Sequence, residues 1–224
     1  MSTTTTHTET VLRLLAWLSP AFPTGAFAYS HGLEWAIESG DISDETTLRD
    51  WLADILTHGA GRSDAILLRH AKRAADVAAL AELSELASAL APSRERRIET
   101  LAQGGAFARA ALAWRSERLA ALAGNDLPYP VAVGALAADH GIDEDATVAA
   151  YLQAITTNLI SAVVRLVPLG QTAGLRVLVA LEPTVAAVAT ETRTATLDDL
   201  GGACFRSEIA AMRHETQHTR LFRT

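Results

Sequence analysis

The chain has 224 residues, of which 49% are hydrophobic, and 19 Lys and Arg stand against 26 Asp and Glu, a net charge of −7. This length suits one sizeable domain, the hydrophobic content excludes wholesale disorder, and the negative charge argues against a general nucleic-acid-binding surface. The single cysteine, Cys204, excludes an internal disulfide and a paired-cysteine metal site, and it fits a reducing compartment.

The N-terminal segment is polar. Residues 1–8 are rich in threonine and lack the basic and apolar regions of a signal peptide, so we expect a disordered start and a cytoplasmic protein. No apolar run reaches the roughly eighteen residues that a membrane span needs, so no membrane association is expected. A short apolar helix is predicted from Glu9 to Leu18, and it ends at Pro20.

An aromatic loop follows, from Ser19 to Glu34. Two prolines prevent a continuous helix here, yet the segment carries three aromatic residues, Phe22, Phe27 and Tyr29. Loops are usually small and polar. A loop this aromatic is either packed on its own core or covered by a partner.

Helical patterns continue after the loop. Ser43 is the expected N-cap of a helix with an apolar face at i, i+3, i+4, i+7 and i+8. That face consists of Leu48, Trp51, Leu52, Ile55 and Leu56. The helix is predicted to end at glycines 59 and 61, and two further helices are predicted over 63–73 and 76–90.

Ser93 is the expected cap of a longer helix. Its apolar residues recur at near-heptad spacing and are Ile98, Leu101, Gly105, Ala108 and Leu112. Each glycine of the pair Gly104-Gly105 costs about 1 kcal/mol of helix stability relative to alanine. We therefore expect either a neighbouring helix packed against the pair or a bend in the helix there.

The longest helix is predicted over 144–167, with Asp143 as its cap and Pro168 and Gly170 at its end. Its apolar stripe consists of Val148, Tyr151, Leu152, Ile155, Leu159, Val163 and Leu166. At about 1.5 Å per residue it is roughly 36 Å long, which suits a central helix of a small domain.

Three more helices are predicted, over 172–181, 184–190 and 205–221, and no window shows sustained strand alternation. The sequence therefore predicts an all-α protein, a single globular helical domain of about eight to ten helices over residues 9–224.

The sharpest local motif is His214-Glu215-Thr216-Gln217-His218, which satisfies H-E-x-x-H. In that pattern two histidines one turn apart bind zinc and the glutamate is the general base. Only six residues follow His218, which leaves no room for a downstream third ligand. The chain also lacks a P-loop and a nucleophile elbow. We expect no catalytic residue, no cofactor and no metal site, and we keep a zinc metalloenzyme as the alternative.

The C-terminal tail, residues 212–224, carries Leu221 and Phe222 between Arg220 and Arg223. Chain ends are usually polar and frayed. Arginine and phenylalanine are both common at the centres of protein interfaces. Either these apolar residues dock on the chain's own core or they dock on a partner, and the sequence shows no obvious internal partner for Arg220.

Several sequence blocks together resemble the urease accessory protein F family. These blocks are Ser19–Glu34, Arg94–Arg97, Tyr129–Gly134 with Gly141-Ile142, Arg165–Thr172 and Met212–Thr224. They keep the family's order across nearly the whole chain. The chain departs from the family pattern at His218-Thr219, where an aromatic residue followed by serine is more usual, and at Phe27, where some members carry tyrosine. The remaining alternative is an unrelated all-α interaction domain that shares only composition.

The resemblance implies a non-catalytic chaperone that joins accessory protein D (also called H) to the GTPase accessory protein G and docks on apo-urease. It implies GTP-dependent delivery of nickel to urease, frequent homodimerisation, and ordering of the tail when it meets accessory protein D. We expect the partner-binding residues on the aromatic loop and the tail to be Phe22, Phe27, Tyr29, Glu34, Arg213, Arg220, Leu221, Phe222 and Arg223.

Overall fold

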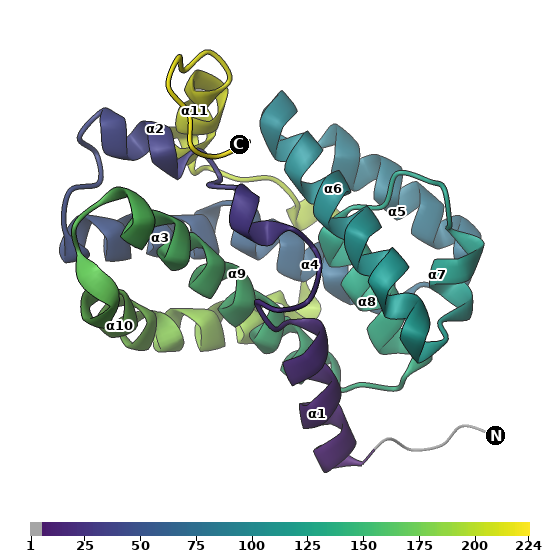
Figure 1. Cartoon of the computed structure of the whole chain (residues 1–224). Helices are drawn as coiled ribbons and strands as arrows, with labels where there is room; N and C mark the ends of the chain where they lie inside the picture. Colours follow the sequence, from purple (N-terminus) through teal and green to yellow (C-terminus); the bar gives the residue numbers. More distant parts are fainter. Residues whose placement is uncertain (1–5) are drawn as a thin grey trace.

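The computed structural model describes residues 6–224, and within that range it contains helices and no strand (Figure 1). The α-helices are α1 (His7–Trp17), α2 (Leu33–Glu38), α3 (Glu45–His58), α4 (Ala60–Arg73), α5 (Val77–Ala89), α6 (Arg94–Ala111), α7 (Glu117–Ala121), α8 (Tyr129–Asp139), α9 (Glu144–Leu166), α10 (Gly170–Glu191) and α11 (Phe205–His214). Four short 3₁₀ helices join them: η1 (Ala26–Ala28), η2 (Leu112–Trp114), η3 (Thr192–Thr194) and η4 (Leu197–Asp199). The prediction of an all-α protein is confirmed.

Helix α8 is the most deeply buried helix, with every residue from Tyr129 to Ala137 inside. Two glycines let its neighbours approach. A Cβ on Gly134 would overlap the backbone of Leu68 in α4, and a Cβ on Gly104 of α6 would overlap the carbonyl oxygen of Leu127, just before α8. The glycine pair therefore marks a close neighbour rather than a bend.

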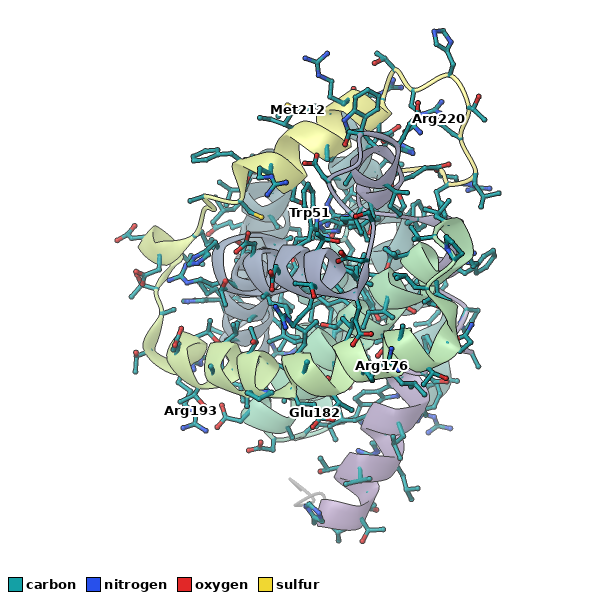
Figure 2. All side chains as sticks on the ribbon, turned by 90° about the vertical axis from the view of Figure 1, so that its left-hand side faces the viewer. Trp51, Arg176, Glu182, Arg193, Met212 and Arg220 are labelled. Carbon is teal, nitrogen blue, oxygen red and sulfur yellow. The ribbon has the colours of Figure 1, made fainter. Side chains whose placement is uncertain are left out.

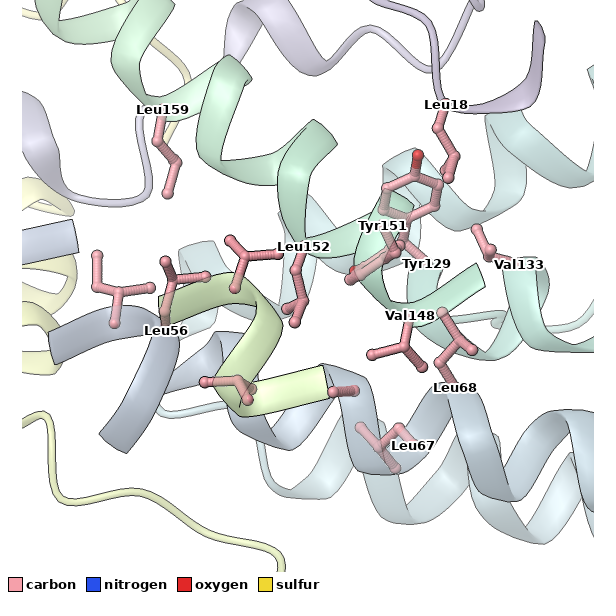
Figure 3. Close-up of a cluster of buried hydrophobic side chains, with 14 of the residues drawn as sticks. Leu18, Leu56, Leu67, Leu68, Tyr129, Val133, Val148, Tyr151, Leu152 and Leu159 are labelled. Carbon is pink, nitrogen blue, oxygen red and sulfur yellow. The ribbon is translucent and has the colours of Figure 1, made fainter. Parts of the chain in front are cut away.

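Helices α9, α10 and α3 form the other half of the molecule (Figure 1). The predicted apolar stripe of α9 is buried at Val148, Tyr151, Leu152 and Leu159. In the core, Val148 lies beside Leu68 of α4 and Tyr151 beside Tyr129 of α8, whereas Leu159 lies apart from them (Figure 3). The whole predicted face of α3 is buried as well. Long stripes with strict helical spacing were therefore predicted correctly.

Two predicted helices, over 172–181 and 184–190, are in fact the single helix α10, which runs through Pro183. A proline inside a helix costs about 3 kcal/mol. Apolar residues on both sides of it are buried on one face: Val177, Leu181, Val185 and Val188. Burial of each such side chain contributes about 1.5–3 kcal/mol, which offsets the proline.

The apolar stripe predicted for α6 is wrong. Ile98 and Leu112 are 45% and 49% exposed. The buried face instead carries polar residues with Phe107 and Ala111, and its polar members are Glu95, Arg96, Glu99 and Gln103. The physical reason is that the C-terminal tail packs along this face, as described below.

Several helix ends differ from the prediction by a few residues. Thr6 caps α1 and bonds with Glu9 in both directions, so α1 begins at His7; residues 1–5 of the predicted disordered start lie outside the described range. Asp44 rather than Ser43 caps α3. Helix α11 ends at His214 instead of continuing to 221, which frees the tail to turn back toward α2 (Figure 1).

Two long helical segments, α9 and Gly170–Thr194, are long and apolar enough to cross a membrane by length and composition alone. Half of the apolar window of α9 and 39% of that of Gly170–Thr194 are buried inside the protein. This is weak support for a membrane span, because the core helix of a soluble protein meets the same criterion.

Candidate partner-binding site

The aromatic loop runs from the end of α1 to α2 and lies against α11. Gly32, at φ 78°, is in the left-handed region, and a Cβ there would lie 2.6 Å from the amide nitrogen of Ala211. Only glycine satisfies both conditions. The preceding residue, His31, is buried and also left-handed at φ 58°, an uncommon backbone conformation for a residue with a side chain. The loop is thus fixed tightly against α11.

The three aromatic residues of the loop lie in different environments. Phe22 is half-buried, with its ring centroid 5.2 Å from that of Phe107 and 5.9 Å from that of Trp114. Tyr29 is buried at 7% exposure, whereas Phe27 is 75% exposed. Two of the rings therefore fasten the loop to the protein's own core, and one remains available on the surface.

The Glu34 carboxylate, at the start of α2, holds the tail by its backbone. One oxygen accepts the Leu221 amide at 2.7 Å, and the other accepts the Phe222 amide at 2.9 Å. Glu34 itself is only 8% exposed. Hydrogen bonds to a buried carboxylate are stronger than neutral ones, so this residue fixes the course of the tail.

Glu95 of α6 makes a second set of contacts to the same region. Its two oxygens lie 2.9 Å from the Arg220 guanidinium and 2.6 Å from Nδ1 of His214. Nε2 of His214 lies 3.3 Å from Glu34. Arg220 thus has an internal partner that the sequence did not reveal, although 39% of its side chain remains exposed.

The last residues pair with the aromatic loop. The carbonyl oxygen of Thr224 accepts from both the amide and the hydroxyl of Ser30, at 2.7 and 2.5 Å, and the Arg223 amide donates to the Ala28 carbonyl at 2.8 Å. The Thr224 hydroxyl donates to Glu99 of α6 at 3.0 Å. The loop and the tail therefore form one unit, held between α2 and α6.

Arg165, near the end of α9, ties this unit to the rest of the fold. Its guanidinium donates to the carbonyl of Phe27 at 2.9 Å and lies 4.5 Å from the centroid of the Phe222 ring. Phe222 is buried at 5% exposure, while its neighbour Leu221 is 67% exposed. The tail thus docks one apolar side chain on the core and presents the other to solvent.

The structure divides the predicted partner-binding residues into two groups. Those that hold the unit together are Phe22, Tyr29, Glu34, Arg220 and Phe222. Those exposed on its surface are Phe27, Arg213, Leu221 and Arg223. Arg213 lies on the last turn of α11. Phe27, Leu221 and Arg223 lie on or next to the hydrogen-bonded segments of the loop and the tail. We call these last three exposed residues the loop–tail surface.

Sequence reasoning missed Glu95, Glu99 and Arg165. One signal could have identified the first two, because Glu95, Glu99 and Gln103 recur every four residues and therefore share one helix face. A face of this kind usually points to solvent, but here the distant tail and the aromatic loop cover it.

A polar cluster lies behind the docked tail, where two small cavities of about 40 and 100 Å³ meet at His31, Asp64, Arg96 and Thr100. Burial raises the pKa of Asp64 to about 6, although its carboxylate accepts the Tyr151 hydroxyl at 2.7 Å. Burial would also raise the pKa of Glu99, but the Arg96 and His31 charges more than offset it and hold that pKa at about 2. The tail thus rests on a charged interior cluster.

The geometry does not support the zinc-site hypothesis for His214 and His218. Both ring nitrogens of His214 face glutamates inside the protein, whereas His218 is exposed on the tail. Within residues 6–224, no three His, Cys, Asp or Glu side chains are grouped so that they could hold a metal ion. The two histidines of the H-E-x-x-H pattern therefore lie in different environments, one in contact with Glu34 and Glu95 and the other at the surface.

Comparison with known proteins gives the same family as the sequence blocks. Residues 42–182 match the family model named UreF. A urease accessory protein UreF of Rhodopseudomonas palustris is 54% identical over 96% of this chain and 92% of its own length. Proteins of the same name from Xanthobacter autotrophicus and Azorhizobium caulinodans are 55% and 53% identical, over 96% and 95% of the chain and 91% and 95% of their own lengths. This agreement excludes an unrelated helical domain that shares only composition, and the chain belongs to the UreF family of urease accessory proteins.

Proposed function

We propose that this protein is a non-catalytic chaperone in the maturation of urease. In this proposal it works in the cytoplasm as a homodimer, joins accessory protein D (H) to the GTPase accessory protein G, and docks the assembly on apo-urease for GTP-dependent nickel insertion. Its relatives are named urease accessory proteins, which supports the pathway. The sequence lacks a P-loop, so GTP hydrolysis would come from a partner.

The observation that carries the proposal is the loop–tail surface. Phe27 and Leu221 are exposed by 75% and 67%, although the backbone around them is tightly held. Exposed apolar side chains on a fixed backbone bind a partner with little loss of conformational freedom. Arg223 adds a cation to this patch, and arginine beside large apolar residues is common at the centres of interfaces.

The exposed and the buried residues of the loop and tail region would have different roles. Phe27, Leu221, Arg213 and Arg223 would touch a partner directly. Glu34, Arg220 and Phe222 would act by holding the tail in place, because their contacts lie within the protein. Substitution in the second group should weaken partner binding through a loss of tail order.

The test is co-purification of accessory proteins D and G from cells that produce all three proteins. The double variant Phe27→Ala/Leu221→Ala should lose most of accessory protein D and, with it, the GTPase, while its helical circular dichroism stays unchanged. Leu112→Ala is the matched control, because Leu112 is 49% exposed and follows the far end of α6, about 27 Å from the tail-facing end. Recovery of both partners at the wild-type level by the double variant would contradict the proposal.

A further inference from the structure

His214 occupies an unusual position. It is the last residue of α11, it is 0% exposed, and it lies between α2 and α6. Its Nδ1 is 2.6 Å from a carboxylate oxygen of Glu95, and its Nε2 is 3.3 Å from a carboxylate oxygen of Glu34. Each ring nitrogen therefore has a negatively charged acceptor, and no other partner is found for it among residues 6–224.

A neutral imidazole cannot satisfy both contacts. It carries one N–H donor and one lone pair, whereas the imidazolium carries two N–H donors. If the nitrogen facing Glu95 carried the only proton, the lone pair of the other nitrogen would point at the buried carboxylate of Glu34. Two backbone amides donate to the Glu34 carboxylate, but a lone pair aimed at this buried negative charge is repulsive and leaves the charge without a facing cation, so the geometry favours a proton on each nitrogen.

The charges around the ring lead to the same conclusion. Helix α2 contributes Glu34 and, one turn on, Glu38, which accepts from the amide of Gln217 in the tail. Helix α6 contributes Glu95, and beyond it Glu99, which is paired with Arg96 and lies 3.9 Å from Nδ1 of the loop residue His31. The tail contributes Arg220, which pairs with Glu95.

His214 and Arg220 together balance Glu34 and Glu95. Glu99 is paired with Arg96, and Glu38 contacts the tail only through the neutral side-chain amide of Gln217. Without the second proton on His214, one negative charge would remain buried beneath the tail.

We propose that the tail docks with His214 as the doubly protonated imidazolium, so that docking takes up a proton and rising pH releases the tail. The sign follows from linkage, because a state that binds an additional proton is favoured at low pH and loses that advantage as the proton concentration falls. The two amides held by Glu34 report the docked state directly. Their protection should fall as pH rises, by at most about tenfold per pH unit, which is the limit for one linked proton.

The first experiment observes the proton itself. Long-range ¹H–¹⁵N correlation spectra of the histidine rings distinguish the imidazolium from either neutral tautomer, and His214→Gln assigns the His214 signals. At about pH 7, near the ordinary histidine value, His214 should show two protonated nitrogens. His218, exposed four residues further along the tail, gives a second set of ring signals in the same spectra for comparison. A neutral His214 ring in the docked tail would overturn the proposal.

The second experiment measures hydrogen exchange at the Leu221 and Phe222 amides between about pH 6 and pH 9, corrected for intrinsic exchange, since histidine loses its charge in this range. Wild-type protection should fall as pH rises. Glu95→Gln should remove most of that dependence, because an amide can pair with the neutral ring. Glu38→Gln is the control, since Glu38 contacts Gln217 and not His214, and it should keep the wild-type slope. Wild-type protection that stays constant with pH would also overturn the proposal.

Discussion

The carboxylate of Glu34 accepts a hydrogen bond from the amide of Phe222 at 2.9 Å, although 188 residues separate the two in the sequence. The same carboxylate accepts the Leu221 amide. A side chain at the start of the second helix therefore determines the backbone course near the other end of the chain. Because Leu221 lies on the loop–tail surface, Glu34 also determines how that surface is presented.

Glu34→Gln should loosen the tail without unfolding the protein. The glutamine keeps one acceptor oxygen but loses the charge and the second acceptor, and a hydrogen bond to a charged group contributes about 1.5–3 kcal/mol. We expect protection of the Leu221 and Phe222 amides to fall roughly tenfold or more. Glu45→Gln, an exposed change whose partner is Arg176, should leave both amides unaffected. Unchanged protection in Glu34→Gln would mean that other contacts hold the tail.

The two adjacent glycines of α6 should respond in opposite ways to alanine. A Cβ at residue 104 overlaps the carbonyl oxygen of Leu127, whereas at residue 105 the nearest atom is the flexible Arg109 side chain at 3.4 Å. Gly104→Ala should lower the free energy of unfolding by about 1–3 kcal/mol through overpacking. Gly105→Ala should raise it by about 0.5–1 kcal/mol through helix propensity. Urea titration of the two variants and the wild type measures both, and equal effects of the two would place the close contact elsewhere.

The buried faces of α3 and α9 were predictable because the spacing of their apolar residues matches the helical repeat. Asp143 caps α9 and Ser93 caps α6, as the sequence indicates, and the stripes of α3 and α9 face the core. Pro183 misled the prediction for a physical reason. Residue type alone predicts a helix break at proline. Whether the helix continues depends on the burial of apolar side chains on both sides of the proline.

The candidate site was predictable in its composition but not in its assembly. The aromatic loop and the arginine-rich tail can be recognised separately, yet nothing local shows that they pair. Glu99 illustrates the problem, because its partner Thr224 lies 125 residues away. A helix face that carries Glu95 and Glu99 has the pattern of a solvated face until the tail covers it.

Trp51→Ala should destabilise the protein strongly. Trp51 is 6% exposed in α3, beneath α11, and the Arg206 guanidinium lies 5.0 Å from its ring centroid (Figure 2). Removal of a buried tryptophan costs about 3–5 kcal/mol. Phe205→Ala is the aromatic control, because Phe205 is 65% exposed, and it should cost less than about 0.5 kcal/mol. A loss below about 1 kcal/mol in Trp51→Ala by urea denaturation would contradict burial of this ring.

Asp64→Asn should stabilise the protein near neutral pH. Burial raises the pKa of Asp64 to about 6, above the value of about 3.9 for an unfolded chain. The folded state therefore binds the proton more tightly, so stability is lost as pH rises from about 4 to about 6 and stays lower above that range. A shift of two units corresponds to about 3 kcal/mol, an upper limit because the residue is partly exposed. The asparagine avoids this penalty and can still accept the Tyr151 hydroxyl.

The measurement is urea unfolding of the wild type and Asp64→Asn at about pH 4 and about pH 7, on either side of the shift. The variant should be more stable by about 1–3 kcal/mol at the higher pH and nearly equal at the lower one. The Glu99 contribution, which is lost only as pH falls toward its pKa of about 2, is common to both proteins and cancels. Asp50→Asn, with 62% of its side chain exposed, should show no such pH-dependent gain. If the two proteins differed in free energy of unfolding by the same amount at both pH values, ionisation of Asp64 could not be the cause of the difference.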